Sequence, residues 1–117
     1  MYGRLKRYGR WGELREEAEL LAMKADSLVR IDPAQSRELY QQAAVKEEEA
    51  LAFPPSPDKP GLQLVYQACL AGAAALYYKA GDYVSARRII AEHGDKIEDG
   101  HCKGRLEEVV AALDEQN

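Results

Sequence analysis

The chain of 117 residues has a formal net charge of −4 and is 46% hydrophobic, which predicts one globular domain that buries a core without disulfides or metals. No apolar run approaches the roughly 20 residues of a membrane span, and no apolar segment follows the basic N-terminus, so we expect neither a membrane protein nor a secreted one. Cys69 and Cys102 have no metal-binding or redox spacing and fit a reducing compartment, so we expect a cytoplasmic location.

Residues 1–12 have no helical period and predict a flexible basic arm. The arm holds no acidic residue, and its positive charges are Arg4, Lys6, Arg7 and Arg10. Such an arm could bind phosphates while its aromatic side chains stack on bases. Alternatively it is a loose terminus, or Trp11 docks on the core. All 20 acidic side chains follow the arm, so nucleic acid is an unfavoured partner for the rest of the surface.

Residues 13–117 predict a single helical domain that opens with two helices. The first begins at Glu13 and ends near Arg30, because Pro33 disfavours helical geometry at Asp32. Its apolar positions recur at steps of three and four residues. Asp32 then suits an N-cap and Pro33 a first turn, so a second helix is expected over 33–51. Its charge run 47–49 is typical of a solvated face, although Glu47 also falls on the apolar stripe of that helix.

The proline-rich stretch 53–61 predicts a loop, because its four prolines interrupt helical hydrogen bonding. It is either a semi-rigid connector or a proline-rich ligand for another domain. We expect Phe53 to enter the core at the end of the preceding helix.

The third predicted helix, 62–80, is apolar nearly all round and therefore belongs in the centre of a bundle. Gly81 suits a left-handed C-terminal position and Asp82 an N-cap, so a fourth helix is expected over Tyr83–His93. A polar turn over 94–104 and an amphipathic helix over 105–114 complete the chain. The sequence thus predicts an all-α fold of about five helices.

Metal-ligating residue types gather at the fourth helix end and the polar turn: His93, Asp95, Glu98, Asp99, His101 and Cys102. Their spacing matches no closed metal site, and the turn contains three glycines. We therefore interpret the segment as a polar turn and expect neither a metal nor a cofactor.

The hairpin over 62–93 combines small, aromatic and aliphatic residues at Leu70, Ala73, Ala74, Tyr77, Gly81, Tyr83, Ala86 and Ile90. In these positions it resembles the tetratricopeptide repeat. A looser copy spans 14–44, where Lys24 and Ser27 depart from the pattern. The resemblance implies antiparallel helical hairpins in an array, in which Ala86 nests against Tyr77.

The same resemblance implies a non-enzymatic interaction module that binds a peptide or partner helix. Its groove would be lined by the first helix of each hairpin, at Ala68, Ala71, Ala75, Tyr78 and Lys79, extended by Leu21, Ala25 and Leu28. Alternatively, this face is covered by the arm or the last helix. The partner is an unidentified protein or peptide, with a second copy of the chain as one option.

Two other functions are weighed. The first hairpin looks like that of the microtubule-interacting-and-transport domain, a three-helix binding module. Arg88 and His93 have the Arg-x4-His spacing of small all-helical ribonucleases of the higher-eukaryote and prokaryote nucleotide-binding family. There the arginine would stabilise phosphate and the histidine would transfer the proton. In that pattern a polar residue is common where Ile89 stands here, and the spacing arises readily by chance.

Overall fold

The computed structural model describes residues 9–53 and 60–116, and within them the fold is all-α, with no strand. The predicted fold class is therefore confirmed. The helices are α1 (Arg10–Leu28), α2 (Pro33–Ala50), α3 (Pro60–Lys79), α4 (Tyr83–His93) and α5 (Gly100–Glu115), with a short 3₁₀ helix, η2 (Gly94–Lys96), between the last two.

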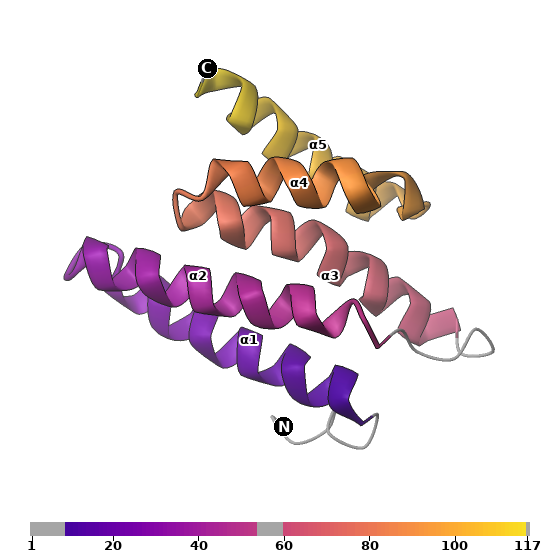
Figure 1. The fold of residues 1–117 in the computed structure, drawn as a ribbon, viewed down its shortest axis with the longest axis horizontal. Helices are drawn as coiled ribbons and strands as arrows, with labels where there is room; N and C mark the ends of the chain where they lie inside the picture. The colour runs from indigo at the N-terminus through magenta and orange to yellow at the C-terminus, as the bar shows by residue number, and fades with distance from the viewer. Residues whose placement is uncertain (1–8, 54–59, 117) are drawn as a thin grey trace.

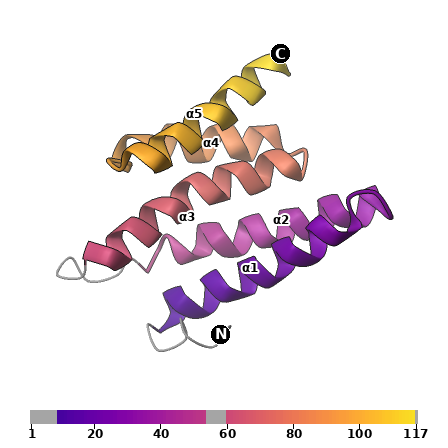
Figure 2. The same cartoon turned by 180° about the vertical axis from the view of Figure 1, so that it is seen from behind.

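The helices form two layers of an array that rises from α1 to α5. Figure 1 looks onto α2 and α4, and Figure 2, from behind, looks onto α1, α3 and α5. Consecutive helices run antiparallel, so α1 with α2 and α3 with α4 form hairpins. The backbones of α1 and α3 both pack closely on α2, whereas α1 and α3 are not among the described helix pairs in close backbone contact. This leaves α2 as a floor between them.

Short turns with matching side-chain chemistry hold the helices in this order. The Asp32 carboxylate accepts from Gln35 N at 3.2 Å, and that of Asp82 accepts from Ser85 N at 3.1 Å. Gly81 has a φ of 82°, which glycine adopts without the steric penalty of other residues. Asp82 also accepts from Gln41 Nε2 at 3.0 Å, so the same residue that starts α4 ties the second hairpin to the first.

Small side chains allow α2, α3 and α4 to pack closely. Ala43, Ala44, Ala73, Ala74 and Ala86 are all fully buried in the main core cluster. The larger members of that cluster include Tyr40 and Tyr77. Ala86 and Tyr77, which the resemblance places against each other, belong to the same core cluster.

The predicted starts of the first and the last helix differ from the structure. Helix α1 begins at Arg10, so the predicted boundary between arm and domain at residue 12 falls inside a helix. The reason is Trp11, which is 2% exposed and packs with Leu14 and Ala50. Helix α5 begins at Gly100, because Asp99 caps it by accepting from Cys102 N at 3.0 Å. The predicted turn over 94–104 was therefore too long.

The prediction that Phe53 enters the core was wrong, because this side chain is 48% exposed. At the end of α2 it is Leu51 that is buried, and its carbonyl accepts from the Tyr66 hydroxyl at 2.7 Å. The prolines at 54, 55 and 57 lie outside the described residues.

Candidate binding groove

A groove of about 200 Å³ opens between α1 and α3, over the floor made by α2. Its walls carry small side chains: Ala18 and Ala22 from α1, and Ala68, Gly72 and Ala75 from α3. A Cβ added at Gly72 would lie 3.7 Å from the nearest atom of Glu47, which is ordinary contact. The small walls therefore leave free volume that side chains of another molecule could fill.

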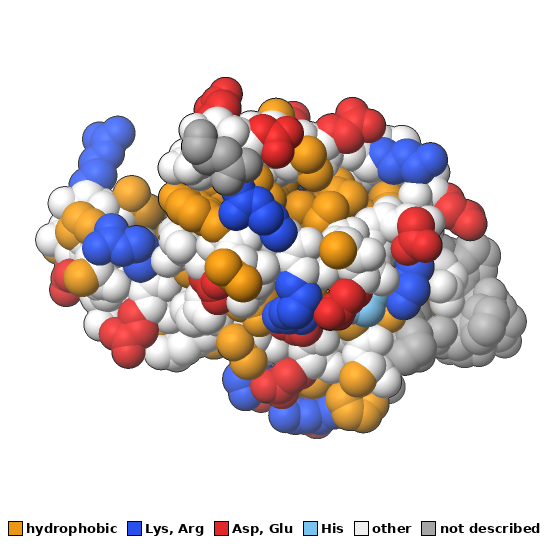
Figure 3. Space-filling view, turned by 45° about the horizontal axis from the view of Figure 1, so that its top comes forward, with side chains coloured by type: hydrophobic (Ala, Val, Ile, Leu, Met, Phe, Trp, Pro, Cys, Tyr) orange, Lys and Arg blue, Asp and Glu red, His pale blue; other side chains and the backbone are white. Residues whose placement is uncertain are grey.

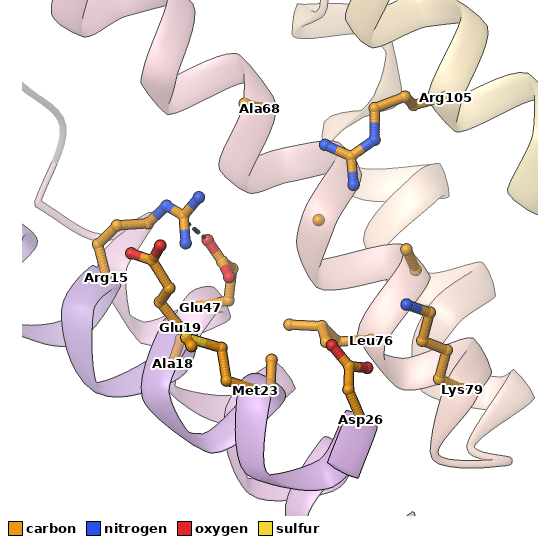
Figure 4. Close-up of a pocket in the computed structure, with 13 residues that line it drawn as sticks. Arg15, Ala18, Glu19, Met23, Asp26, Glu47, Ala68, Leu76, Lys79 and Arg105 are labelled. Carbon is orange, nitrogen blue, oxygen red and sulfur yellow. Dashed lines mark ion pairs between the residues drawn. The ribbon is translucent and has the colours of Figure 1, made fainter. Parts of the chain in front are cut away.

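The floor of the groove holds a buried ion pair (Figure 4). Glu47 is 3% exposed, and its Oε1 lies 3.2 Å from Nε of Arg15. Neither of these two atoms makes a hydrogen bond of acceptable geometry. The two charges are close but poorly aligned, so their attraction is retained without the additional stabilisation of a good hydrogen bond.

Burial affects the pKa of both members of this pair. Burial raises the pKa of Glu47 more than the Arg15 guanidinium lowers it. For Arg15, burial lowers the pKa, but Glu47, Cys69 and Glu19 together raise it more, so the guanidinium stays charged. The thiol of Cys69, which lies beside both groups, has its pKa raised well above the usual range by burial. Glu47 is thus a carboxylate whose ionisation is disfavoured by the fold.

The rim of the groove carries opposite charges on its two sides. Glu19 and Asp26 project from α1, whereas Lys79 and Arg105 project from α3 and α5 (Figure 4). Among the described residues, no ion pair within 4.0 Å engages any of these four side chains. These four charges are therefore not neutralised by an ion pair, although Asp26 and Lys79 both contact Tyr40.

Tyr40 contacts two of these rim residues. Its hydroxyl donates to Asp26, and Nζ of Lys79 lies 5.5 Å from the centre of its ring. Burial and the neighbouring Asp26 carboxylate raise the pKa of Tyr40 to about 12. The phenol therefore stays protonated, and it holds the anion of α1 and the cation of α3 on opposite sides of the groove.

Of the predicted groove residues, Ala68, Ala75 and Lys79 line the groove. Ala71 and Ala25 are 1% and 0% exposed and belong to the core instead.

The other predicted groove residues lie elsewhere. Leu21 and Leu28 pack, half-buried, against the main core cluster. Tyr78 packs against Tyr83 of α4, with ring centres 5.4 Å apart, and is not part of the groove lining.

The groove residues that the sequence reasoning missed are the charged ones, above all Arg15 and Glu47. One signal was present: Glu47 falls on the apolar stripe of α2, where a carboxylate is out of place unless it has a partner. Nothing in the local sequence named Arg15 as that partner, because the two residues lie on different helices.

Arg88 and His93, the residues of the ribonuclease hypothesis, belong to α4. They therefore lie on the layer formed by α2 and α4, which we call the outer layer. Arg88 donates to Glu48 with both terminal nitrogens, at 2.7 and 2.9 Å, and Tyr77 donates to the same carboxylate at 2.6 Å. Nδ1 of His93 lies 3.2 Å from Nζ of Lys96. No described contact joins Arg88 to His93, and the guanidinium that would have to hold a phosphate is already engaged.

The remaining predicted ligands do not converge. Among the described residues, no three His, Cys, Asp or Glu side chains are grouped as a metal site would require. Of the cationic arm residues, Arg4, Lys6 and Arg7 lie outside the described residues. Arg10 belongs to α1, where it pairs with Glu13 at 3.3 Å.

Comparison of the chain with protein-family models, with curated proteins and with solved structures found no match. No described helix combines the length and hydrophobicity that a membrane span requires. The resemblance to tetratricopeptide repeats therefore rests on the residues and the helix arrangement alone.

Proposed function

We propose that the protein is a non-enzymatic, tetratricopeptide-like interaction module that binds a peptide or helix of a partner protein in the groove between α1 and α3. The observation that carries this proposal is the groove itself, with small side chains on the facing walls of α1 and α3, which are not among the closely packed helix pairs of the described chain. A helix or extended peptide laid between such walls gains apolar contacts without displacing the core.

The layer arrangement supports the same proposal. In a tetratricopeptide-like array the first helix of each hairpin lines the binding face, and here α1, α3 and α5 share one layer (Figure 2). Residues from each of these three helices line the groove. The second helices, α2 and α4, form the opposite layer and close the core.

The charged rim suggests the chemistry of the bound segment. A segment with basic side chains toward Glu19 and Asp26, and acidic side chains toward Lys79 and Arg105, would complement both walls. Because these rim charges are exposed, they contribute more to orientation and association rate than to affinity.

Site-specific photocrosslinking in extracts of the native host tests the proposal. A photoreactive residue replaces Met23, which lines the groove and is 50% exposed, or as a control Val84, which is 79% exposed on α4. We expect one partner to crosslink from position 23 and not from 84, and to be lost when Ala75→Trp fills the groove. Equal crosslinking from both positions, or crosslinking that survives the filled groove, would contradict the proposal.

The same purified protein distinguishes the enzyme alternative. Incubation with RNA, beside a His93→Ala control, should show no cleavage that depends on His93. Cleavage lost in the variant would replace the interaction module with the ribonuclease.

A further inference from the structure

The groove between α1 and α3 differs from the groove between α4 and α5 in a feature that can select a ligand. The groove between α4 and α5, of about 210 Å³, is lined mainly by apolar side chains, and Figure 3 shows an apolar band on this side of the molecule. None of its lining side chains has a buried polar atom without a hydrogen bond. Apolar contact discriminates weakly between ligands, whereas buried hydrogen-bonding groups discriminate strongly.

The floor of the groove between α1 and α3 has two such polar atoms. They are Oε1 of Glu47 and Nε of Arg15, which lie 3.2 Å apart and have no hydrogen bond. The first is an acceptor and the second a donor. Leaving buried polar atoms without hydrogen bonds is unfavourable, so a bound group that supplies both bonds is stabilised. The floor therefore offers a ligand one acceptor and one donor side by side.

Gly72 of α3 leaves the Glu47 carboxyl group uncovered on the groove side. The three atoms nearest to a Cβ added there would be Cδ, Oε2 and Oε1 of Glu47, at 3.7, 3.8 and 3.9 Å. These are ordinary contacts, so alanine would fit at position 72 and would favour the helix more than glycine does. The Arg15 side chain is 25% exposed, so packing does not fix it on all sides. A group that enters over Gly72 can therefore approach both polar atoms.

The charges around this groove balance, which disfavours a charged group at its floor. The lining includes three acidic and three basic residues: Glu19, Asp26 and Glu47, and Arg15, Lys79 and Arg105. A cationic side chain would satisfy Glu47 but meet the like charge of Arg15, and a carboxylate would do the reverse. A carboxamide has an N–H donor and a C=O acceptor side by side, so it matches both atoms without adding charge.

We propose that the groove recognises a glutamine side chain of the partner, whose carboxamide donates to Oε1 of Glu47 and accepts from Nε of Arg15. This inference rests on the proposed interaction module, because it names the chemistry of the segment bound in the same groove. Glutamine is favoured over asparagine, serine and threonine because its longer stem lies between the alanines of the two walls while its carboxamide reaches the floor.

Selection of random linear peptides on the purified full chain tests this inference. Counter-selection on Ala75→Trp, in which the groove is filled, removes peptides that bind elsewhere. We expect the retained peptides to share one glutamine. In a synthetic copy, replacing that glutamine by methionine, which has similar length but no amide, should weaken binding about ten-fold in calorimetric titration. Glutamate should weaken it further, because its charge would lie beside that of Glu47.

A matched pair of glycine variants locates the contact on the protein. Gly72→Ala places a methyl group over the Glu47 carboxyl group and should weaken the glutamine peptide about ten-fold. The preference for glutamine over methionine should fall in the same variant, because the carboxamide no longer reaches the floor. Gly104→Ala in α5 is the control, because a Cβ added there meets nothing within 4 Å. It should bind like the wild type, and neither variant should melt at a lower temperature.

The possible outcomes separate this inference from the interaction module. Groove-dependent peptides with a charged residue or a hydroxyl at the shared position would overturn the glutamine inference and leave the module standing. An unchanged preference for glutamine over methionine in Gly72→Ala would do the same. If no selected peptide depended on the open groove, the interaction module would be contradicted together with the glutamine inference.

Discussion

Two adjacent carboxylates of α2, Glu47 and Glu48, lie on opposite sides of the molecule. Glu48 lies toward the outer layer, where it accepts two hydrogen bonds from Arg88 and one from Tyr77. Glu47 lies in the groove, where its contact with Arg15 lacks hydrogen-bond geometry. The hydrogen bonds from Arg88 lower the pKa of Glu48, whereas burial raises that of Glu47.

The difference between the two carboxylates shows which side of the array is held by hydrogen bonds and which side has free volume. On the outer side one carboxylate joins α2, α3 and α4 through well-aligned bonds. On the groove side the chain places a charge that the fold does not satisfy fully, beside small residues and free volume. Incomplete satisfaction of polar groups is a frequent property of binding sites, in contrast to structural networks.

The largest effect is expected at Trp11, which packs between α1 and α3. Trp11 packs against Leu62 and Val65 in addition to its buried neighbours. Trp11→Ala should lower the free energy of unfolding by about 3–5 kcal/mol, measured by urea denaturation. Phe53→Ala is the control, because that ring is 48% exposed, and should change stability by less than about 1 kcal/mol. A small loss at Trp11 would show that the groove walls are held together elsewhere.

Two alanines compare the packed interior with the open groove. Ala86 is 0% exposed in the main core, whereas Ala75 lines the groove. Ala86→Leu should cost roughly 1–3 kcal/mol through overpacking. Ala75→Leu should cost less than about 0.5 kcal/mol, because its extra atoms enter free space. Equal losses in thermal or urea melts would mean that the groove is part of the core.

A smaller effect is expected for the outer carboxylate. Glu48→Gln removes the negative charge that Arg88 and Tyr77 bind, and should cost about 1 kcal/mol at neutral pH. The value is at the low end for charged hydrogen bonds because the Arg88 side chain is 40% exposed. High salt should reduce the loss measured by urea denaturation, and a loss independent of salt would point to packing instead.

Most of the fold followed from local sequence signals. Asp32-Pro33 and Gly81-Asp82 mark the hairpin turns, and the prediction of α4 over Tyr83–His93 was confirmed residue by residue. The start of α1 was not predicted, because the three glycines of residues 1–12 disfavour a helix. The first turn of α1 is stabilised instead by the burial of Trp11. That burial depends on α2 and α3, which local periodicity does not report.

The groove was only partly predictable for the same reason. Ala68, Ala75 and Lys79 followed from the resemblance to the tetratricopeptide repeat, whereas Ala25 and Ala71, which the same resemblance implied, proved to be core. The pairing of Glu47 with Arg15, and of Glu48 with Arg88, depends on how helices far apart in the sequence are placed. The place of Glu47 on the apolar stripe of α2 set it apart from Glu48, but the local sequence did not identify the partner of either carboxylate.

The contributions of Glu47 and Glu48 to stability should respond oppositely to pH. Glu48, with a lowered pKa in the folded state, contributes stability above the unfolded value of about 4.5, which is lost as pH falls through its folded pKa. Glu47, with a raised pKa, does the reverse, because the folded state binds the proton more tightly. Its ionisation therefore reduces stability as pH rises from about 4.5 toward its folded pKa.

Urea denaturation of the wild type, Glu47→Gln and Glu48→Gln from pH 3 to pH 8 (on the order of the range that spans carboxyl titration) measures both responses together. Relative to the wild type, Glu48→Gln should lose stability as pH rises toward about 4.5 and stay constant above it. Glu47→Gln should gain relative stability as pH rises from about 4.5 to the folded pKa of Glu47, and stay constant above it. Parallel curves for the two variants would contradict the account, because the two carboxylates would then share one environment.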